Sequence, residues 1–527
     1  MISERIYSIR TERHMSQEAV AEKLGVSRQS IQKWEAGDSQ PTVQNLITLS
    51  RLFGVSVDYF CGNSETEVEA NRMGIPILPS YEKQYLWDSY FKALGTEYRQ
   101  SFDEGKDIAK YEELFKIVSQ LPDNKYKSQL AEILFSIVTE APQRDDFGYY
   151  EPNSLDAIIA SRNENGIKLR IPAEKVLSDK MLGGWFGRIC GCLLGKPVEC
   201  MYGSELNTVL KKTGNFPLRR YIEREEITPE VAEGILHPIM ERAFPRNIGY
   251  MPSDDDTNYM LLAVKLIERY GRDFTSENVL QNWISSQLIN QYCTAERVAY
   301  RNYLNGYQPP ESAEYQNPYR EWIGAQIRGD VYGYINPCNP EEAASMAYRD
   351  AAISHIKNGI YGEMWVSAMI AAAFGTDNLK DIINIGLSQV PCTSRFYEAV
   401  SKVVSDFEAG VSESDFFDDF HKRWNEKNSH DWTHVISNAE IVAASLLYGN
   451  GDYGKSICIS VAQAFDTDCN GATVGSVLGV RNGFNSIPKE WTAPVNDTLE
   501  SGFDGHTRVS ITEMAQRSLR LATTRQR

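Results

Sequence analysis

Two runs of aspartates, about 210 residues apart, are the residues of this chain best suited to chemistry. The first run contains Asp254, Asp255 and Asp256, the second contains Asp466 and Asp468, and each opens onto an apolar segment with helical spacing. Closely spaced carboxylates suit hard divalent cations such as Mg²⁺ or Mn²⁺ and hydrolysis of an oxygen-rich substrate. One Asp at a helix start is explained as a cap, but three in a row exceed what a cap needs. We therefore expect the runs to be two halves of one metal site.

Two glycine-striped segments are the elements that must position these runs. An interior glycine lowers helix stability by up to about 1 kcal/mol relative to alanine, so close packing must compensate for each one. We expect the two segments to be helices that pack against each other and hold their acidic ends together. The glycines recur at every fourth residue, at Gly183, Gly187, Gly191 and Gly195 and again at Gly471, Gly475, Gly479 and Gly483.

Glu199 follows the first glycine helix. Pro197 stops that helix and fixes the loop that presents the carboxylate. A lone Glu is usually a surface residue, but beside the aspartate runs Glu199 becomes a candidate ligand or base. Cys190 and Cys192, on the same helix, are interpreted as small packing residues. The nine cysteines include no Cys-x-x-Cys pair, which argues against a disulfide framework and against a zinc site.

Length and composition indicate two or three domains with substantial cores. The chain has 527 residues, of which 42% are hydrophobic, and a mean hydropathy of −0.40. It has no apolar run near ~18 residues and a charged start, so we expect no membrane span, no secretory signal and a cytoplasmic location. The net charge of −17 falls on residues 61–527, because residues 1–60 carry seven basic and seven acidic residues. Only the N-terminal segment is therefore suited to DNA.

Residues 1–62 have the pattern of a small helical DNA-binding domain. Ser16 precedes a helix over 17–24 that Gly25 ends, and Ser27 precedes a second helix over 28–35. The second helix buries Ile31 and Trp34 and turns a polar face outward. Such a face can enter a DNA groove, so we expect duplex DNA contacts from Gln17, Arg28, Gln29, Ser30, Gln32 and Lys33. A plain helical bundle with a polar face is the alternative.

Residues 63–145 contain no constellation of chemical interest. The first part, to about residue 80, lacks periodicity and is predicted to be a linker. Helical spacing returns between residues 81 and 140, which indicates a helical spacer that packs on the next domain or pairs between chains. The fold class we expect is all-α: a small helix-turn-helix bundle over 1–62, a helical linker over 63–145 and a large helical domain over 146–527.

Two resemblances support this division. Residues 16–41, with the Ser16-Gln17-Glu18 start and the Lys33-Trp34-Glu35 stretch, resemble the phage-repressor (Xre) type of helix-turn-helix, which implies a homodimer on pseudo-palindromic DNA. The large domain resembles the ADP-ribosylglycohydrolase family. Its matching motifs are Gly191-x-x-x-Gly195-x-x-x-Glu199, Asp254-Asp255-Asp256-Thr257, His355 and Asp466-Thr467-Asp468 with Gly471-Ala472.

The family resemblance implies an all-α fold and a cleft for ADP-ribose with two Mg²⁺ or Mn²⁺ ions at its base. It implies metal ligands at Asp254, Asp255, Asp256, Asp466 and Asp468, and catalytic roles for Glu199, Asp255 and Asp256. It also implies a glycine loop over 329–334 and a substrate-side histidine, so that the substrate-binding residues are Gly329, Tyr332, Gly333 and His355. Cys192 and Cys469 depart from the pattern, because Asp and Thr are common at these positions.

These features together favour a DNA-binding protein with a metal-dependent hydrolase domain. The expected reaction breaks the N- or O-glycosidic bond of an ADP-ribosyl or related ribosyl substrate, in connection with transcription control. The alternative is a ligand-sensing transcriptional regulator whose hydrolase-like domain binds ADP-ribose or a nucleoside without turnover.

Overall fold

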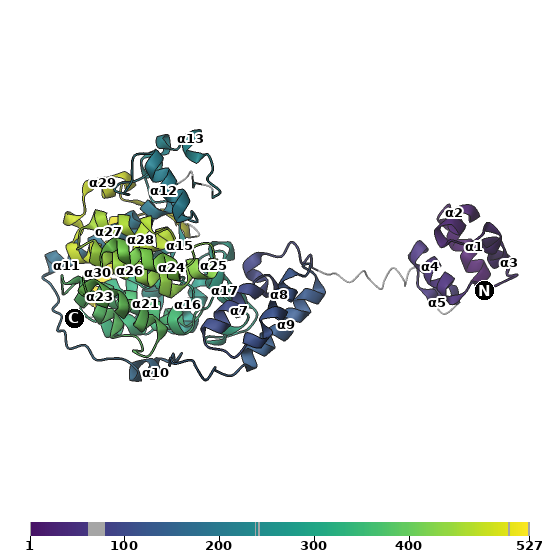
Figure 1. Ribbon diagram of the computed structural model, residues 1–527, viewed down its shortest axis with the longest axis horizontal. Coiled ribbons are helices and arrows are strands. Elements are labelled where there is room, and N and C mark those ends of the chain that lie inside the picture. The colour runs from purple at the N-terminus through teal and green to yellow at the C-terminus, as the bar shows by residue number, and fades with distance from the viewer. Residues whose placement is uncertain (1, 62–78, 238, 241–242, 504–505, 525–527) are drawn as a thin grey trace. The chain divides into compact units, whose positions relative to one another are not determined.

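The computed structural model describes residues 2–61, 79–237, 239–240, 243–503 and 506–524. The chain divides into two compact units, Met1–Tyr81 and Glu82–Arg527 (Figure 1). Within the described residues the only sheet is an antiparallel hairpin of β1 (Thr498–Phe503) and β2 (His506–Ser510). The predicted all-α fold is therefore confirmed, with one small hairpin that helical periodicity did not reveal. None of the described helices is long and apolar enough to cross a bilayer.

The first unit is a small helical bundle whose helix ends follow the predicted capping residues. The Ser16 hydroxyl accepts the backbone N–H of Ala19, and the Ser27 hydroxyl accepts that of Ser30. Gly25 ends the intervening helix in the left-handed conformation, with φ of 67°. Ile31 and Trp34 are buried, as the sequence predicts. The helices are α1 (Ile2–Glu12), α2 (Gln17–Leu24), α3 (Arg28–Ala36), α4 (Val43–Phe53) and α5 (Val57–Cys61).

The second unit is a large helical assembly around a large hydrophobic core, with a smaller separate cluster that contains Ala93, Ala295 and Trp322. Its first half contains α7 (Leu94–Asp103), α8 (Glu112–Gln120), α9 (Lys125–Glu140), α10 (Leu155–Ala160), α11 (Glu174–Gly195), α12 (Gly203–Lys212), α13 (Pro229–Ala232), α14 (Pro245–Ile248), α15 (Asp255–Tyr270), α16 (Ser276–Ile284), α17 (Thr294–Leu304), α18 (Glu311–Glu314) and α19 (Asp330–Tyr334). Its second half contains α20 (Pro340–Ala351), α21 (Lys357–Ala373), α22 (Leu379–Leu387), α23 (Arg395–Glu408), α24 (Glu413–Arg423), α25 (Ser429–Thr433), α26 (Val435–Tyr448), α27 (Tyr453–Ala462), α28 (Thr467–Asn482), α29 (Lys489–Thr492) and α30 (Ile511–Thr523).

Helices α11 and α28 form the closest helix pair of this unit. Their glycine stripes face each other, so that Gly187 lies against Gly475 and Gly191 against Gly471. A Cβ on any of these glycines would come within 3.0 Å of backbone atoms of the other helix. The predicted helix pair is therefore confirmed, and it sets the N-terminal end of α28 beside the C-terminal end of α11. Gly483 stands outside the stripe, because it caps α28 with φ of 81°.

Residues 82–140 pack against the rest of the large unit through buried charges. The Arg320 guanidinium donates to Glu104 at 2.6 Å and to Glu97 at 3.0 Å, and both acids lie in or just after α7. Gln100 donates to Glu321 at 2.7 Å. These helices thus belong to the second compact unit, while the boundary proposed at residue 145 stays a prediction. Most of the predicted linker, residues 62–78, lies outside the described residues.

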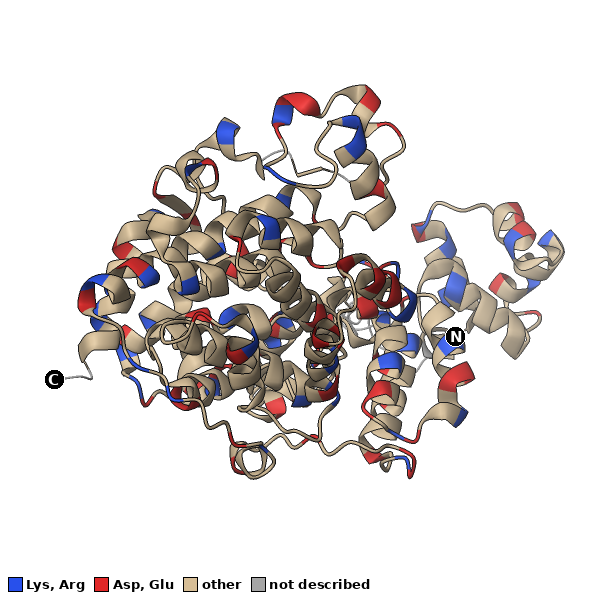
Figure 2. Cartoon of the chain, turned by 60° about the vertical axis from the view of Figure 1, so that its left-hand side comes forward, with Lys and Arg blue, Asp and Glu red and all other residues tan. Residues whose placement is uncertain are grey.

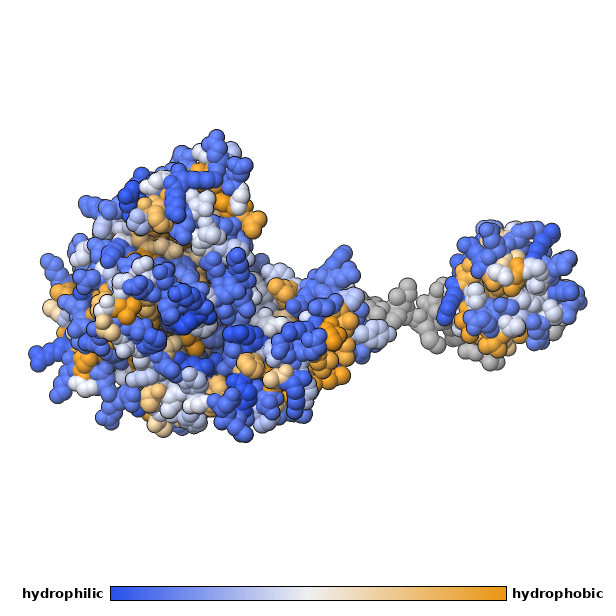
Figure 3. Space-filling model, viewed as in Figure 1, coloured by the Kyte–Doolittle hydropathy of each residue, from blue (hydrophilic) through white to orange (hydrophobic). Residues whose placement is uncertain are grey.

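The surface of the large unit is largely hydrophilic, with apolar areas between the charged ones (Figure 3). Lys and Arg are interspersed with Asp and Glu along its outer helices (Figure 2). An apolar patch covers the exposed side of α8 and α9 (Figure 3). This patch contains Leu114, Ile117, Tyr126, Leu130 and Ile133, which are between 36% and 73% exposed.

Candidate functional site

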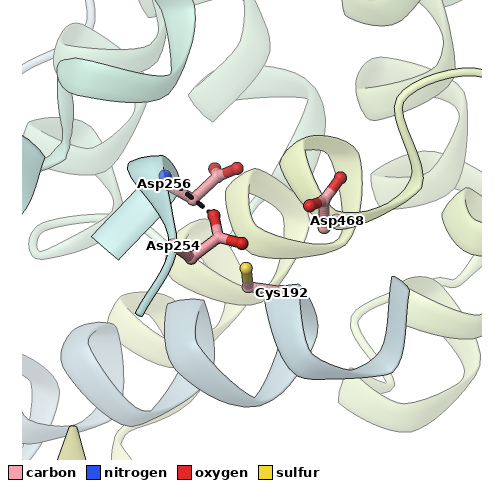
Figure 4. A group of neighbouring side chains, drawn as sticks. All are labelled: Cys192, Asp254, Asp256 and Asp468. Atoms are coloured by element: carbon pink, nitrogen blue, oxygen red, sulfur yellow. Dashed lines mark hydrogen bonds between the residues drawn. The ribbon is translucent and has the colours of Figure 1, made fainter. Parts of the chain in front are cut away.

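Three helix ends meet at a buried cluster of carboxylates. Asp254 caps α15, Asp256 lies in the first turn of the same helix, and Asp468 lies in the first turn of α28. Ligand atoms of these residues and the Cys192 sulfur, from α11, all lie within 4.8 Å of one another (Figure 4). A second group, formed by Asp466, Asp468 and Cys469, meets the same criterion. Asp468 is common to both groups, so the two aspartate runs converge on one place.

Asp256 is fully buried and is held by a buried cation. Arg188 of α11 donates to its Oδ1 at 2.7 Å and to Asp330 at 2.9 Å. Burial raises the pKa of Asp256 well above its ordinary value, although Arg188 opposes the shift. The other oxygen, Oδ2, has no hydrogen-bond partner among the described residues. A buried carboxylate oxygen without a partner is costly, which indicates a ligand position.

Lys196 is a second cation at the cluster. Its Nζ donates to Asp254 Oδ2, and both side chains are largely buried. Burial would lower the pKa of Lys196, but Asp254 and then Asp468 outweigh this effect and raise it. For Asp254, burial works in the opposite sense and Lys196 holds the carboxyl pKa below its ordinary value. This lysine therefore orients Asp254 as a charged oxygen donor.

Glu199 and Asp255 lie half-buried and belong to neither of the two ligand groups. Burial, followed by the charge of Asp468, raises the pKa of Glu199 well above its ordinary value. Burial, followed by the charge of Asp254, raises the pKa of Asp255 to about 8. Asp466 precedes α28, and burial followed by Asp468 raises its pKa as well. The structure thus brings all six predicted acids into one electrostatic neighbourhood, with Glu199 and Asp255 on the more accessible side.

The donor set fits divalent cations. Three carboxylates and a thiol offer ligand atoms at the first group, and two carboxylates and a thiol at the second. The partnerless Asp256 Oδ2 is one of the available atoms. Oxygen and sulfur donors of this kind are those that divalent metal ions take in proteins.

The segment 329–334 does not form the expected glycine loop. It forms α19 and the turn before it, and a Cβ on Gly333 would strike Ile370 of α21. Tyr332 is fully buried and donates its hydroxyl hydrogen to Asp350 at 2.7 Å. These glycines allow α19 and α21 to approach closely, while substrate contacts from Gly329, Tyr332 and Gly333 stay a prediction. Asp330, whose negative charge would repel a phosphate, pairs with Arg188.

His355 is also buried. Its Nδ1 lies 2.8 Å from the Ser354 hydroxyl, while Nε2 has no partner among the described residues. Burial, reinforced by the charge of Arg328, holds the pKa of His355 well below its ordinary value. The imidazole is therefore neutral at pH 7, and a substrate contact from it stays a prediction.

Asn438 supports the second ligand group through its side-chain amide. Its Oδ1 accepts from Asn470 at 2.8 Å and from the Asp466 backbone N–H at 3.4 Å. Its Nδ2 donates to the backbone carbonyl of His434 at 3.0 Å. Asn438 thereby ties the start of α26 to the start of α28, where the second ligand group lies.

Four residues of the cluster were missed or misjudged from the sequence. Cys192 was interpreted as a packing residue, whereas its sulfur lies among the carboxylates. Arg188, Lys196 and Cys469 were given no role. The available signal for Arg188 and Lys196 was a basic residue on or directly after the glycine-striped helix. No sequence signal shows toward which side a buried cysteine points.

The predicted DNA-binding face lies on the first unit. Gln29, Gln32 and Lys33 are exposed on α3. Arg28 pairs with Glu18 at 2.9 Å while both remain exposed. Gln17 donates to Glu35 at 2.7 Å, and the hydroxyls of Ser30 and Ser27 share a hydrogen bond of 2.9 Å. The outward face of α3 is thus open, while the role of each side chain on DNA stays a prediction.

Comparison with known proteins matches both units. Residues 173–527 match the family model for ADP-ribosylglycohydrolase, and residues 6–60 match the helix-turn-helix model. A solved structure named "ADP-ribosylglycohydrolase-related protein complex" aligns with 66% of this chain and 98% of its own length. The identity is 17% and the TM-score is 0.41.

The relatives found among curated proteins share the first unit. The transcriptional activator BcrR of Enterococcus faecalis is 36% identical over 63 residues, which cover 12% of this chain and 31% of the activator. The prophage-derived regulator YonR of Bacillus subtilis is 32% identical over 73 residues, 14% of this chain and 68% of the regulator. The phage repressor RstR of Vibrio cholerae is 32% identical over 66 residues, 12% of this chain and 59% of the repressor. The first unit is therefore a helix-turn-helix DNA-binding domain.

Proposed function

Because this chain belongs to the ADP-ribosylglycohydrolase family, we propose that its large unit hydrolyses the N- or O-glycosidic bond of an ADP-ribosyl or related ribosyl substrate. The observation that carries the proposal is the convergence of Asp254, Asp256 and Asp468 at one buried centre. These acids come from two distant parts of the chain, and a purely structural helix pair has no need of them. A set of carboxylates with a partnerless oxygen is suited to holding cations.

Each residue of the site has its own role in the proposed hydrolysis. Asp254, Asp256 and Asp468 would hold divalent cations, which supply Lewis-acid stabilisation and activate water when bound. Lys196 and Arg188 fix Asp254 and Asp256 in place through direct hydrogen bonds. Glu199 and Asp255, which are half-buried, would take the proton of water. Departure of the leaving group then gives an oxocarbenium-like transition state at the ribose.

We further propose that the first unit delivers this activity to DNA in the cytoplasm as a homodimer. Its curated relatives are transcriptional regulators, and its α3 face is exposed. Helix-turn-helix domains commonly bind two half-sites as dimers. The apolar patch on α8 and α9 offers a surface for pairing of two copies.

The second candidate is a regulator whose large unit binds ADP-ribose or a nucleoside without turnover. The curated relatives favour it, since they carry regulatory names and match only the first unit. In that case a ligand changes DNA affinity and no glycosidic bond is broken.

One experiment separates the two candidates. The full chain is incubated with a divalent cation and ADP-ribosyl-arginine, O-ADP-ribosyl or nucleoside substrates, and released ribose or ADP-ribose is followed by mass spectrometry. We expect cation-dependent release that is abolished in Asp256→Asn and Asp468→Asn. The exposed Asp418→Asn is the control and should retain full activity. Binding without release from any substrate would establish the sensor instead.

A further inference from the structure

Each of the two ligand groups contains one cysteine. The Cys192 sulfur lies among oxygens of Asp254, Asp256 and Asp468, and the Cys469 sulfur lies with Asp466 and Asp468. Figure 4 shows the Cys192 sulfur rising from α11 toward Asp254. Both thiols are buried, with 0% and 6% of the residue exposed. Sulfur is therefore present at both places where the carboxylates gather.

Packing alone does not explain this placement. Cys190 lies two residues earlier on the same helix, is equally buried, and belongs to no such group. A cysteine that only fills space is ordinarily surrounded by apolar groups, whereas Cys192 faces three carboxylates. The buried Asp256 Oδ2 without a partner is a separate sign that a ligand belongs here. The sulfur and oxygen donors thus gather at the same centre.

We propose that Cys192 and Cys469 each supply one sulfur ligand, to two neighbouring divalent cations that share Asp468. The centre accordingly selects a borderline transition metal ion such as Zn²⁺ or Co²⁺ over Mg²⁺. Thiolates are soft ligands that favour such ions, whereas Mg²⁺ takes oxygen donors in a strict octahedral arrangement. Cys192 and Cys469 would bind as thiolates, each releasing its proton to solvent. This inference rests on the metal centre of the proposed function and specifies its metal class.

The test measures metal selection without any substrate. The metal-stripped full chain is dialysed against equimolar Mg²⁺, Mn²⁺, Zn²⁺ and Co²⁺, and bound metals are counted by mass spectrometry. We expect wild type to retain Zn²⁺ or Co²⁺ in preference to Mg²⁺. Cys192→Ser and Cys469→Ser should lower the ratio of bound Co²⁺ to bound Mg²⁺ by about tenfold or more, since loss of even an outer-shell partner weakens metal binding 10–100-fold. Cys190→Ser is the matched control and should leave the ratio unchanged.

A spectroscopic reading identifies the sulfur directly. Co²⁺ bound to thiolate gives a near-ultraviolet charge-transfer band, which should be present in wild type and Cys190→Ser and reduced in each ligand variant. Cys192→Asp keeps a ligand but replaces sulfur by oxygen. It should retain metal and shift the preference toward Mg²⁺, and it decides the question if Cys192→Ser fails to fold.

Three results would overturn the inference: a preference of wild type for Mg²⁺, absence of the band from wild type, or a band undiminished in both serine variants. Loss of the band in only one serine variant would overturn the assignment of one sulfur to each cation. The outcome is independent of the hydrolysis assay. A thiolate band without ribosyl release would contradict the proposed function alone, and Mg²⁺-supported release without the band would contradict this inference alone.

Discussion

Gly187 of α11 and Gly475 of α28 are in mutual backbone contact, because a Cβ on either glycine would overlap the carbonyl oxygen of the other. Neither helix has side chains between the two backbones at this level. The relative position of the helices is therefore set by the peptide backbone itself. Since Cys192 lies in the last turn of α11 and Asp468 in the first turn of α28, this contact also fixes the spacing of their ligand atoms.

We expect Gly187→Ala to lower the free energy of unfolding by about 1–3 kcal/mol, because overpacking outweighs the gain in helix propensity. Separation of the helices should also weaken binding of divalent cations. Urea unfolding and isothermal titration calorimetry measure the two effects. Gly95→Ala, in α7, is the control, since nothing lies within 4 Å of its Cβ position. Equal stability of the two variants would contradict the tight contact.

Arg188→Met should destabilise the chain by about 3–5 kcal/mol, because it leaves two buried carboxylates, Asp256 and Asp330, without their cation. Adding Asp256→Asn to this variant should restore part of the loss, since one uncompensated charge disappears. Arg517→Met, which breaks a partly exposed pair with Glu268, should change stability by only about 0–1 kcal/mol. Chemical denaturation of wild type, the double variant and the two single variants measures the free energy of unfolding. If Arg188→Met lowered it no more than Arg517→Met does, the buried pairing would be refuted.

Glu321 should make stability dependent on acid pH. Burial alone would raise its pKa, but Arg395, 2.9 Å from both carboxylate oxygens, and His434 hold the pKa well below its ordinary value. A carboxyl with a lowered folded-state pKa adds stability above its unfolded pKa of about 4.3, and this contribution is lost as pH falls through the folded value.

The stability difference between wild type and Glu321→Gln should therefore be about 3–5 kcal/mol at pH 7 and should shrink below about pH 4. Urea unfolding at pH 7, 5 and 3 measures it. Glu398→Gln, at an exposed position nearby, should show little difference at any of these pH values. A difference for Glu321→Gln that stays constant down to pH 3 would rule out the ionised pair.

Lys33→Ala should weaken binding to duplex DNA uniformly across sequences and reduce the slope of log affinity against log salt by about 1, because one phosphate contact is lost. Fluorescence anisotropy across a salt series gives this slope. Arg51→Ala removes the same charge from an exposed position in the last turn of α4. We expect no change in this slope for Arg51→Ala. A similar change of slope in both variants would contradict the assignment of α3 as the DNA-facing helix.

The apolar patch on α8 and α9 should be needed for dimer formation. A double change, Ile117→Glu and Ile133→Glu, places charges on two residues that are 51% and 57% exposed. Folding should be retained, while light scattering after size exclusion should report a monomer. Ile159→Glu, at an exposed position of α10 outside the patch, should leave the dimer intact. A dimer that survives the double change would place the interface elsewhere.

Residue spacing alone was sufficient to predict the helix pair and the meeting of the aspartates. Glycines at every fourth position indicate close packing of two helix backbones. Such packing brings the acids at the helix ends together. The caps at Ser16 and Ser27 were equally local signals. These features depend on neighbours within one or two helical turns, which is the range over which sequence patterns are informative.

Features that depend on long-range contacts were missed. Gly329 and Gly333 have the composition of a loop, yet they lie against α21, which sequence spacing does not show. The direction of the Cys192 sulfur depends on the rotation of α11, and that rotation is set by α28, about 280 residues away in the sequence. Arg188 and Lys196 acquire their roles only when Asp256 and Asp254 are brought beside them.

The buried contacts of Arg320 show that the compact unit extends beyond the residues matched by the family model. The family model begins at residue 173, but Arg320, well inside it, has its acid partners at Glu97 and Glu104. A chain shortened to the family boundary would leave this guanidinium in the interior without a counter-charge. The part of the fold that matches the family model thus depends on a segment that lies outside the matched residues. We therefore expect the large unit to fold by itself only when it begins near residue 82.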